Sequence, residues 1–469
     1  MRIIGLDLAI TGKHAAIVMA ENGQYLSPVF KLRTWPKELA ALLDRSRQDV
    51  EAAHPVAVIM EPTGYAWLPV ASYLCRQAGV TVYLVNTQAV ADLRRYLKKH
   101  AKSDRIDSRV LCKIWLVSPE KLHPLRLPEG DMLALRQACK QLDQVTDRIT
   151  AIKNQVTALD HTVWLGGLSR LVFKEAFGPA ALWSRQHFYD PRQVLCAGAD
   201  SIRQQWQAAA LDEADPGQWA QYLVELAAEV VAIYDHPSPY VDFAAWQAQM
   251  HLNLHSLAHF EAQQRHLRLK VVRPLYRRLH PSRHLETLRG VGQDSAAVFL
   301  SFIAHPDRFA TQRLLRGWSG MVPRSSQSGE SESQGLRISQ AGPDLVKKYA
   351  FLDADVARLW DPQLAKIYHD QMVHKGKHHN QAVCTVATHL LDRVLVILKE
   401  DRPYQLRDVD GSLLTRQQAR QVVLEHYTVP KEVRQRNNKN ARRKRANQRA
   451  ERNFARSQDK KVGKAPSAG

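Results

Sequence analysis

The first 115 residues or so alternate between stretches with the period of a strand and stretches with the period of a helix. Five stretches have the composition and flanking turns of strands: residues 2–9, 14–20, 24–31, 57–60 and 80–85. Asn22-Gly23, a dipeptide typical of tight hairpins, separates the second from the third. The fourth is apolar at every position, as in a parallel strand buried on both faces, and we expect the same burial for the fifth.

Helical periods fill the gaps between these strands. We expect helices beginning at Pro36 and over residues 65–78, 88–99 and 103–115. A hairpin meander followed by parallel crossover units predicts a mixed α/β sheet with helices on its faces, as in an RNase H-like fold. The glycine-rich G-x-G-x-x-G turn that marks a dinucleotide-binding sheet is absent from the sequence.

From Asp131 onward the apolar positions follow the 3-4 spacing of a long helix. They are Met132, Leu135, Cys139 and Leu142, then, after a three-residue skip, Val145, Ile149, Ile152, Val156 and Leu159. Two such heptad blocks predict a coiled-coil seam or a long bundle helix. The spacing leaves open whether the partner helix belongs to the same chain or to a second copy.

The rest of the chain is predicted to be mainly helical. Residues 165–250 suggest helices without assignable chemistry, residues 251–279 one long basic helix, and residues 285–402 a compact helical region with a polar loop at 323–335. We therefore divide the chain into an α/β domain (1–125), a coiled coil with a helical insertion (126–284), a second helical domain (285–428) and a tail (429–469).

The net charge points to a polyanionic partner. The 469 residues include 66 Lys and Arg against 46 Asp and Glu, a net charge of +20, which favours nucleic acid. The last 39 residues hold 14 of these basic residues and 3 of the acidic ones, a net +11, with almost no large apolar side chains. We expect this tail to be disordered when free, either as a solubilising terminus or as a phosphate-binding arm.

Other classes of protein are disfavoured. No continuous apolar run approaches the ~20 residues of a membrane span, so we expect no membrane partner. The chain opens on an expected strand rather than on a leader peptide. Its five cysteines are scattered without a C-x-x-C pair, which predicts a cytoplasmic protein with neither disulfides nor a structural zinc site.

Four carboxylates form the strongest chemical signal. Asp7 ends the first expected strand, and Glu61 ends the fourth, where a Pro-Thr-Gly turn directs the chain away. Asp104 and Asp107 lie one helical turn apart on one face. Clustered carboxylates repel one another unless a cation is present, and such hard ligands suit Mg²⁺ or Mn²⁺. Two such ions can clamp the attacking and leaving oxygens of a phosphodiester. Taken singly, Asp104 is also explained as a helix N-cap and Asp107 as a surface residue.

A glycine turn and a basic loop predict phosphate contacts. Arg289, Gly290 and Gly292 lie in an Arg-Gly-Val-Gly turn between apolar helices, which is the pattern of a helix-hairpin-helix, although an ordinary tight turn is the alternative. Lys375 and Lys377 lie in the loop His-Lys-Gly-Lys-His-His, for which a DNA contact is favoured over zinc because no cysteine lies at ligand spacing. Lys347 and Lys348 complete the expected set of nucleic-acid-binding residues.

The polar loop at residues 320–331 carries several serines beside Arg324. Such loops are usually solvated linkers. The alternative is a serine nucleophile on a mobile loop, with the arginine fork holding the non-bridging oxygens of a phosphate. Composition alone does not separate the two, because no histidine base is placed by spacing.

These motifs, in this order, resemble those of the DEDD transposases of the insertion-sequence 110/1111 family. The matching stretches are Gly-Leu-Asp, Met-Glu-Pro-Thr-Gly-Tyr, Lys-Ser-Asp-Arg-Ile-Asp-Ser-Arg, Leu-Arg-Gly-Val-Gly, and Gly-Met-Val-Pro-Arg followed by Gln-Ser-Gly. They fall within residues 1–160 and 285–400. Residues 165–250 are longer than the family pattern needs, and the basic tail has no counterpart in it.

The resemblance implies a RuvC-like nuclease domain, a coiled coil, and a helical transposase domain with a conserved serine. The acidic tetrad falls on Asp7, Glu61, Asp104 and Asp107, which would be both catalytic and ligands of Mg²⁺ or Mn²⁺. The nucleophile falls on Ser328, with Ser325 and Ser326 close enough to compete for the role. The resemblance also implies recombination guided by a structured RNA that the mobile element encodes.

The expected function is therefore that of a DNA transposase or recombinase in a prokaryotic cytoplasm, associated with the nucleoid. Its expected partners are the element ends and target DNA, the guide RNA, and further copies of itself as a dimer or tetramer joined at the coiled coil. One alternative is a metal-dependent nuclease of the Holliday-junction type that uses the tetrad alone, with water as nucleophile. A non-enzymatic nucleic-acid scaffold is a third, which a complete tetrad disfavours.

Overall fold

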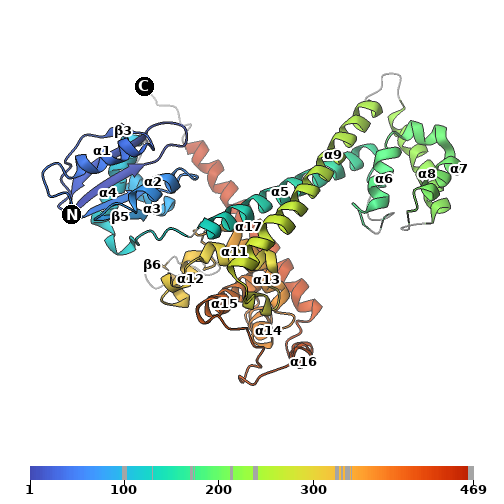
Figure 1. The fold of residues 1–469 in the computed structure, drawn as a ribbon. Coiled ribbons are helices and arrows are strands. Elements are labelled where there is room, and N and C mark those ends of the chain that lie inside the picture. The colour runs from blue at the N-terminus through green and yellow to red at the C-terminus, as the bar shows by residue number, and fades with distance from the viewer. Residues whose placement is uncertain are drawn as a thin grey trace. The chain divides into compact units, whose positions relative to one another are not determined.

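The chain forms two compact units, Met1–Glu129 and Gly130–Gly469 (Figure 1). The computed structural model describes residues 1–97, 103–128, 130–168, 173, 175–211, 215–235, 241–322, 327–328, 331–332, 338–339 and 341–462. The finer division into four domains stays a prediction.

The first unit contains a mixed five-stranded sheet. Its strands are β1 (Arg2–Asp7), β2 (His14–Ala20), β3 (Phe30–Leu32), β4 (Val56–Met60) and β5 (Val80–Leu84). Their order is β3-β2-β1-β4-β5, with antiparallel pairing on the β2 side of β1 and parallel pairing on the β4 side. This hairpin meander followed by parallel crossovers confirms the predicted mixed α/β sheet, which is compatible with an RNase H-like domain.

The third strand is much shorter than predicted. Residues 24–31 were expected to pair throughout, but the observed β3 covers three residues. The reason lies opposite, in β2: the backbone N–H of Val18 donates to the hydroxyl of Ser27 at 3.1 Å instead of to a strand carbonyl. A side-chain oxygen in the ladder interrupts regular pairing there.

Four helices cover the two faces of this sheet, as predicted. They are α1 (Pro36–Ser46), α2 (Trp67–Leu74), α3 (Thr87–Leu97) and α4 (Asp104–Val117), followed by the 3₁₀ turn η1 (Pro119–Lys121). Because alternate strand residues point to opposite faces, the core divides in two. Ile4 and Val58 pack with α1 and α2 on one face. Ile3 and Ile59 pack with α3 and α4 on the other.

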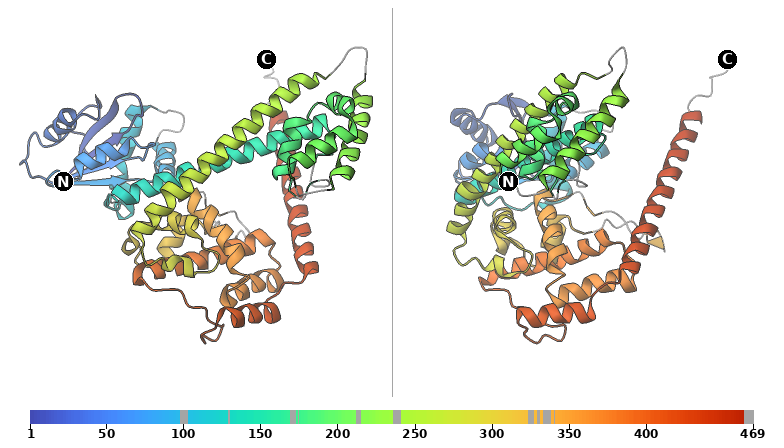
Figure 2. Two further views of the ribbon diagram at one scale, coloured as in Figure 1. Left: turned by 45° about the vertical axis from the view of Figure 1, so that its right-hand side comes forward. Right: turned by 90° about the vertical axis from the view of Figure 1, so that its right-hand side faces the viewer.

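The second unit is built on an antiparallel pair of long helices (Figures 1 and 2). They are α5 (Gly130–Val163) and α9 (Phe243–His266), the latter continuing through the π-helical η2 (Leu267–Val272) into α10 (Arg273–Leu279). Lys153 pairs with Glu261 at 2.9 Å, and Gln264 donates to Thr146 at 2.8 Å. The predicted long basic helix at 251–279 is thus confirmed as the later part of a helical run that begins at Phe243.

The heptad seam of α5 finds its partner within the same chain. Seven of the nine predicted seam positions are buried in this unit: Leu135, Cys139, Leu142, Val145, Ile149, Ile152 and Val156. Of the two alternatives left open by the spacing, the structure therefore shows the intrachain one. The expectation that this seam joins two copies is not supported, because its apolar side chains are already covered.

Three helices at one end of this pair correspond to the stretch without assignable chemistry: α6 (Pro179–His187), α7 (Pro191–Ala208) and α8 (Pro216–Tyr234). They pack around aromatic side chains, with the Trp206 and Trp219 rings stacked at 4.1 Å between centroids. The Asp190-Pro191 dipeptide begins α7, with the aspartate side chain accepting from the N–H of Arg192 at 2.9 Å. Helices were predicted here and are confirmed.

The remaining helices form a compact bundle at the other end. They are η3 (His284–Thr287), α11 (Gln293–Ile303), η4 (Pro306–Arg308), α12 (Gln312–Ser319), α13 (Asp344–Ala357), α14 (Pro362–His369), the π-helical η5 (Asp370–His374), α15 (His379–Glu400) and α16 (Arg416–His426). Among the described residues α15 is the one helix long and apolar enough to cross a membrane, although no continuous apolar run marked it. Over half of its apolar window is buried by other helices, as in a core helix. The predicted polar loop contains two short strands, β6 (Gln327–Ser328) and β7 (Ser331–Glu332).

The basic tail forms a helix, α17 (Lys431–Val462), rather than the predicted disordered segment (Figure 2). The prediction rested on the lack of apolar residues and was wrong over this range. Lys431–Val462 contains neither glycine nor proline and is rich in Arg, Lys, Ala and Gln, which are strong helix formers. Residues 463–469 lie outside the described part of the tail.

Candidate active site and nucleic-acid interface

Asp7 and Glu61 lie at the same edge of the sheet. β1 and β4 are parallel neighbours, and Leu6 is in register with Met60. Asp7 and Glu61 are the next residues of their chains, so their backbones are adjacent where the two strands end. The turn after Glu61 includes Gly64 with a φ of +54°. This placement agrees with the prediction that both carboxylates project from strand ends.

A glycine in β1 brings the third and fourth acids to this edge. A Cβ atom at Gly5 would lie 2.0 Å from the carbonyl oxygen of Ser108, so only glycine lets α4 approach β1 this closely. Ser108 directly follows Asp107, and Asp104 begins the same helix. The close contact between α4 and β1 therefore directs the first turn of α4, with both aspartates, toward the strand end at Asp7.

The simpler explanations of the two helix acids fail. The N-cap of α4 is Ser103, whose hydroxyl accepts from the N–H of Ile106, so Asp104 does not serve as the cap. Asp107 is only 8% exposed, so it is not a surface residue. A buried carboxylate needs a compensating partner, and Arg94 of α3 lies 2.8 Å from Asp107.

The acids are electrostatically coupled. Burial first, and then the neighbouring charges of Asp107, Asp104 and Glu61 in that order, together raise the pKa of Asp7 to about 6. Lys31 of β3, which forms an ion pair with Asp104, opposes this shift. The other three carboxylates therefore all lie within electrostatic reach of Asp7.

Two cations already compensate the helix acids. Besides the pair of Lys31 with Asp104, Arg94 of α3 donates to Asp107 at 2.8 Å. Among the described residues, no three of these four acids have oxygen atoms that all lie within 4.8 Å of one another. The all-oxygen donor set nevertheless fits Mg²⁺ or Mn²⁺, and a bound cation would lower the pKa of Asp7 by supplying opposite charge.

The segment that carries the predicted serine has its two ends held together. Gly320 and Gly342, with φ of +73° and +76°, flank it, and a Cβ at either would lie within about 2.1 Å of a carbonyl oxygen on the other arm. The N–H of Ser339 donates to the carbonyl of Val322 at 2.9 Å. Within the segment, Ser328 of β6 is paired with Ser331 of β7. Arg324, Ser325 and Ser326 lie outside the described residues.

The predicted helix-hairpin-helix turn precedes α11. Gly290 has a φ of +93°, and a Cβ there would lie 2.3 Å from the carbonyl of Asp353, so this glycine serves packing against α13. Gly292 is the N-cap residue of α11 and has open space at its Cβ position, which keeps its backbone accessible to a phosphate. Burial, followed by the charge of Arg416, lowers the pKa of Arg289. The element before the turn is the single 3₁₀ turn η3 rather than a full helix.

The predicted lysines divide into two pairs. Lys347 donates to the carbonyl of Ala341 at 3.0 Å, and Lys348 pairs with Asp143 of α5 at 2.6 Å. These internal partners compete with any phosphate for the two ammonium groups. Lys375 is exposed and Lys377 half-buried in the loop between η5 and α15, which suits the predicted contact better.

Comparison with known families agrees with the motif order. A model of DEDD transposases of the IS110 type, described as a transposase, matches residues 4–162, and one described as the transposase IS116/IS110/IS902 family matches residues 282–369. Together they cover just over half of the chain. The chain belongs to the IS110 family of transposases. All four acids lie in the first matched segment, and Ser328 lies in the second.

Curated relatives share short segments with this IS110-family chain. The insertion element IS110 uncharacterized 43.6 kDa protein of Streptomyces coelicolor is 30% identical over 129 residues, which are 27% of this chain and 31% of the relative. The pilin gene-inverting protein of Moraxella bovis is 23% identical over 128 residues, 27% of this chain and 40% of the relative. That of Moraxella lacunata is 24% identical over 123 residues, 26% and 38% of the two chains. The chain thus spans less than half the length of each of these relatives.

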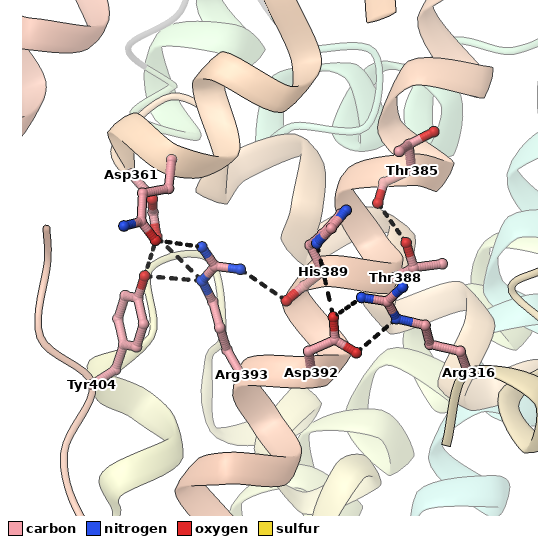
Figure 3. Close-up of polar contacts among 9 residues, drawn as sticks. Arg316, Asp361, Thr385, Thr388, His389, Asp392, Arg393 and Tyr404 are labelled. Atoms are coloured by element: carbon pink, nitrogen blue, oxygen red, sulfur yellow. Dashed lines mark hydrogen bonds and ion pairs between the residues drawn. The ribbon is translucent and has the colours of Figure 1, made fainter. Parts of the chain in front are cut away.

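Sequence reasoning missed a polar cluster along α15 (Figure 3). Arg316 of α12 donates to both carboxylate oxygens of Asp392. Arg393, the next residue of α15, donates to the Tyr404 oxygen at 2.9 Å, and Tyr404 donates to the fully buried carboxylate of Asp361 at 2.6 Å. These partners lie far apart in the sequence, so no local motif reveals them.

A basic depression adjoins this cluster. It has a volume of about 530 Å³ and lies between α12 and α15, where its cationic lining is Arg313, Arg316 and Lys399. Arg313 and Arg316 share a face of α12, whose C-terminal end leads into the serine segment. Their i, i+3 spacing is the one sequence signal that would have suggested a basic face here. The depression is a candidate site of phosphate contact.

Proposed function

We propose that this IS110-family chain is a DNA transposase or recombinase that cuts and rejoins the DNA of a mobile insertion sequence. The observation that carries the proposal is the meeting of four carboxylates from β1, β4 and α4 at one sheet edge, within the segment that matches the DEDD family. A net charge of +20 supports a polyanionic substrate. The N-terminal unit would be an RNase H-like or RuvC-like nuclease domain.

Asp7, Glu61, Asp104 and Asp107 would hold Mg²⁺ or Mn²⁺. When bound, such ions supply positive charge against the phosphate oxygens of the scissile group. Lys31 and Arg94 keep two of the acids oriented through their ion pairs, so the site is partly preorganised. The acids also bind protons less readily once a cation is present, which favours the charged form of Asp7 at neutral pH.

Ser328 is the proposed nucleophile. Its hydroxyl oxygen would attack phosphorus and form a phosphoserine bond, while the bond from phosphorus to one DNA oxygen breaks. The serine proton ends on the released DNA hydroxyl, and the reverse reaction with a different DNA hydroxyl rejoins strands. The family resemblance and the held ends of the serine segment support this assignment. Arg324 would hold the non-bridging oxygens.

The proposed partners are DNA, a structured guide RNA and further copies of the chain. RNA guidance rests on the family resemblance and on the positive charge. Pilin gene-inverting proteins are named for a DNA rearrangement, which is in keeping with strand exchange here. Because exchange joins two DNA sites, we propose a dimer or tetramer, assembled through a surface other than the covered seam of α5.

A denaturing gel of the full chain with labelled element DNA and Mg²⁺ tests the nucleophile. We expect a covalent protein–DNA adduct that Ser328→Ala abolishes, together with strand exchange, while DNA binding remains. Ser325→Ala and Ser326→Ala are the matched controls and should keep activity. An adduct that survives Ser328→Ala but not Ser325→Ala or Ser326→Ala would move the nucleophile to that serine.

The tetrad is tested separately. Alanine at Asp7, Glu61, Asp104 or Asp107 should each abolish recombination with folding nearly intact. Each change removes one carboxylate from a cluster that repels Asp7, which offsets the ion pairs with Lys31 and Arg94 that are lost at Asp104 and Asp107. Two of the four variants recombining at wild-type rates would contradict the metal site. If the serine variants all stay active while the acid variants do not, the chain is instead a metal-dependent junction nuclease with water as nucleophile.

A further inference from the structure

The second unit contains a compact group of two imidazoles and a carboxylate. His369 ends α14, and Asp370 and His374 begin and end η5. The Nδ1 atom of His369 lies 4.0 Å and the Nε2 atom of His374 3.8 Å from Oδ1 of Asp370. Among the described residues this is the one group of three potential metal ligands whose donor atoms all lie within 4.8 Å of one another.

The π-helical turn creates this group. Residues five apart lie about 140° from each other around an α-helix, so His369 and His374 would point in different directions. In the wider π turn, with its i to i+5 hydrogen bonds, residues five apart come closer together around the axis. The rings of His369 and His374 accordingly stand 5.6 Å apart, edge to face. Such π turns are uncommon and are often found at functional sites.

The donor atoms suit a borderline transition ion. Zinc bonds of about 2.0–2.2 Å to nitrogen and oxygen place tetrahedral ligand atoms roughly 3.3 Å apart. The two distances from the histidines to Oδ1 of Asp370, 4.0 and 3.8 Å, are longer than this, so the side chains would have to draw together for the group to close on an ion. Two neutral imidazoles are poor ligands for Mg²⁺ and good ligands for Zn²⁺.

The carboxylate is already oriented for this role. Lys366 donates to Oδ2 of Asp370 at 2.6 Å and leaves Oδ1 facing the two histidines. Carboxylates that bind a metal are commonly oriented by hydrogen bonds of this kind, from a residue that does not itself bind the metal. His374 is largely exposed, with 67% of its side chain accessible, which gives an ion from solution a path to the group.

We propose that His369, Asp370 and His374 form a Zn²⁺-class metal site distinct from the acidic tetrad. The sequence had suggested His374 only as part of a loop with His378 and His379, whereas the structure pairs it with residues before it. The ion would close the site with water in the fourth position. It would also fix η5, the turn on which the basic helix α17 docks.

The docking contacts come from the start of α17. Asn437, only 5% exposed, donates to the carbonyl of Met372 within η5 at 2.7 Å and to that of Lys377 at 3.2 Å. Asn438 accepts from the N–H of His379 at 3.1 Å. A metal that holds both ends of η5 therefore stabilises the surface that orients α17.

Zinc binding to the full chain tests the proposal. The probe is Zn²⁺ in competition with a chromophoric chelator, with millimolar Mg²⁺ present to occupy hard-oxygen sites. We expect one tight Zn²⁺ site that weakens roughly tenfold or more in His374→Ala and in Asp370→Asn. The matched control is His426→Ala, because exposed His426 also lies beside a carboxylate, 3.9 Å from Glu425, but belongs to no three-ligand group among the described residues. It should bind zinc as the wild type does.

Two outcomes would overturn the site. One is equal zinc affinity and stoichiometry in the wild type and in His374→Ala. The other is the same loss in His426→Ala, which would indicate nonspecific binding to surface histidines. His374 is exposed and Asp370 half-buried, and circular dichroism of each variant checks that folding is unchanged. Co²⁺ in place of Zn²⁺ gives a visible spectrum that reports nitrogen ligation directly, and loss of that band in His374→Ala but not in His426→Ala is the expected result.

Discussion

Asp353 of α13 is a buried acid for which the described part of the chain supplies no cation as partner. Its Oδ1 accepts from the hydroxyl of Ser295 at 2.8 Å, and among the described residues its Oδ2 has no hydrogen-bond partner. Burial raises its pKa to about 8, against which the Ser295 hydrogen bond acts only weakly. The folded state therefore holds a proton here that the unfolded chain releases near pH 4.

This raised pKa predicts a pH-dependent stability difference. Stability from the protonated form is complete below about pH 4 and is lost as the pH rises toward 8, by roughly 1.4 kcal/mol per pH unit at most. Asp353→Asn keeps the shape and the acceptor without the charge. The difference in unfolding free energy, variant minus wild type, should increase between pH 6 and 8 and then level off, as measured by chemical denaturation. Asp344→Asn, exposed on the same helix, should show no such gain, and a constant difference for Asp353→Asn would contradict the prediction.

Gly5 makes the acidic site possible without being part of it. In Gly5→Ala the new Cβ would need the space of the Ser108 carbonyl oxygen, so α4 must move away from β1. Overpacking of this kind typically costs about 1–3 kcal/mol. Because α4 carries Asp104 and Asp107, recombination should fall far more than the melting temperature indicates.

The control for this variant is Gly12→Ala, whose Cβ would meet only the Ala9 side chain, at 3.7 Å. It should recombine and melt like the wild type. A Gly5→Ala protein with full activity would show that the close contact of α4 with β1 does not position the acids.

At the scale of elements, the start of α17 depends on one buried amide. Asn437→Ala would leave the carbonyls of Met372 and Lys377 without their donor. The docking of α17 on η5 should thereby lose roughly 1–3 kcal/mol of stabilising free energy. The bundle has its own core, so the global melting temperature should change little. Hydrogen exchange within α17 and its cleavage by trypsin should become faster. Asn440→Ala, exposed one turn further on, should leave both unchanged, and equal protection in the two variants would argue against this anchor.

The elements that were predicted best are those whose pattern is local. The helix at Pro36 and strand β2 begin at the predicted residues, because proline and the hydrophobic period act within a few positions. β3 was overestimated because a side chain from Ser27 replaces a ladder partner. The helical tail was missed because a composition poor in apolar residues outweighed its strong helix propensity and because its anchor on η5 is distant in sequence.

At the scale of the molecule, the sequence placed the acids on the correct elements but could not supply the contact that brings them together. That contact is the packing of Ser108 on Gly5, between residues about 100 positions apart. The phosphate-binding lysines were less well predicted, since Lys348 pairs with Asp143 of a helix 200 residues earlier. A lysine in the sequence does not show whether its ammonium group contacts solvent, another part of the protein or a phosphate.

The charge of α17 is best tested apart from its anchor. Deleting residues 431–469 removes 14 basic and 3 acidic residues, a net +11, but also removes Asn437. Replacing exposed Arg442, Arg443 and Lys444 by glutamine removes three charges and keeps the helix and its docking contacts. If these side chains bind phosphate, the affinity for duplex DNA falls and the slope of log K against log salt becomes shallower by about 0.9 per lost contact. The deletion should shift the slope further in the same direction. Fluorescence anisotropy over a salt series measures the affinity and the slope. If neither the glutamine variant nor the deletion alters the slope, α17 contacts no phosphate and the rest of the chain supplies the binding surface.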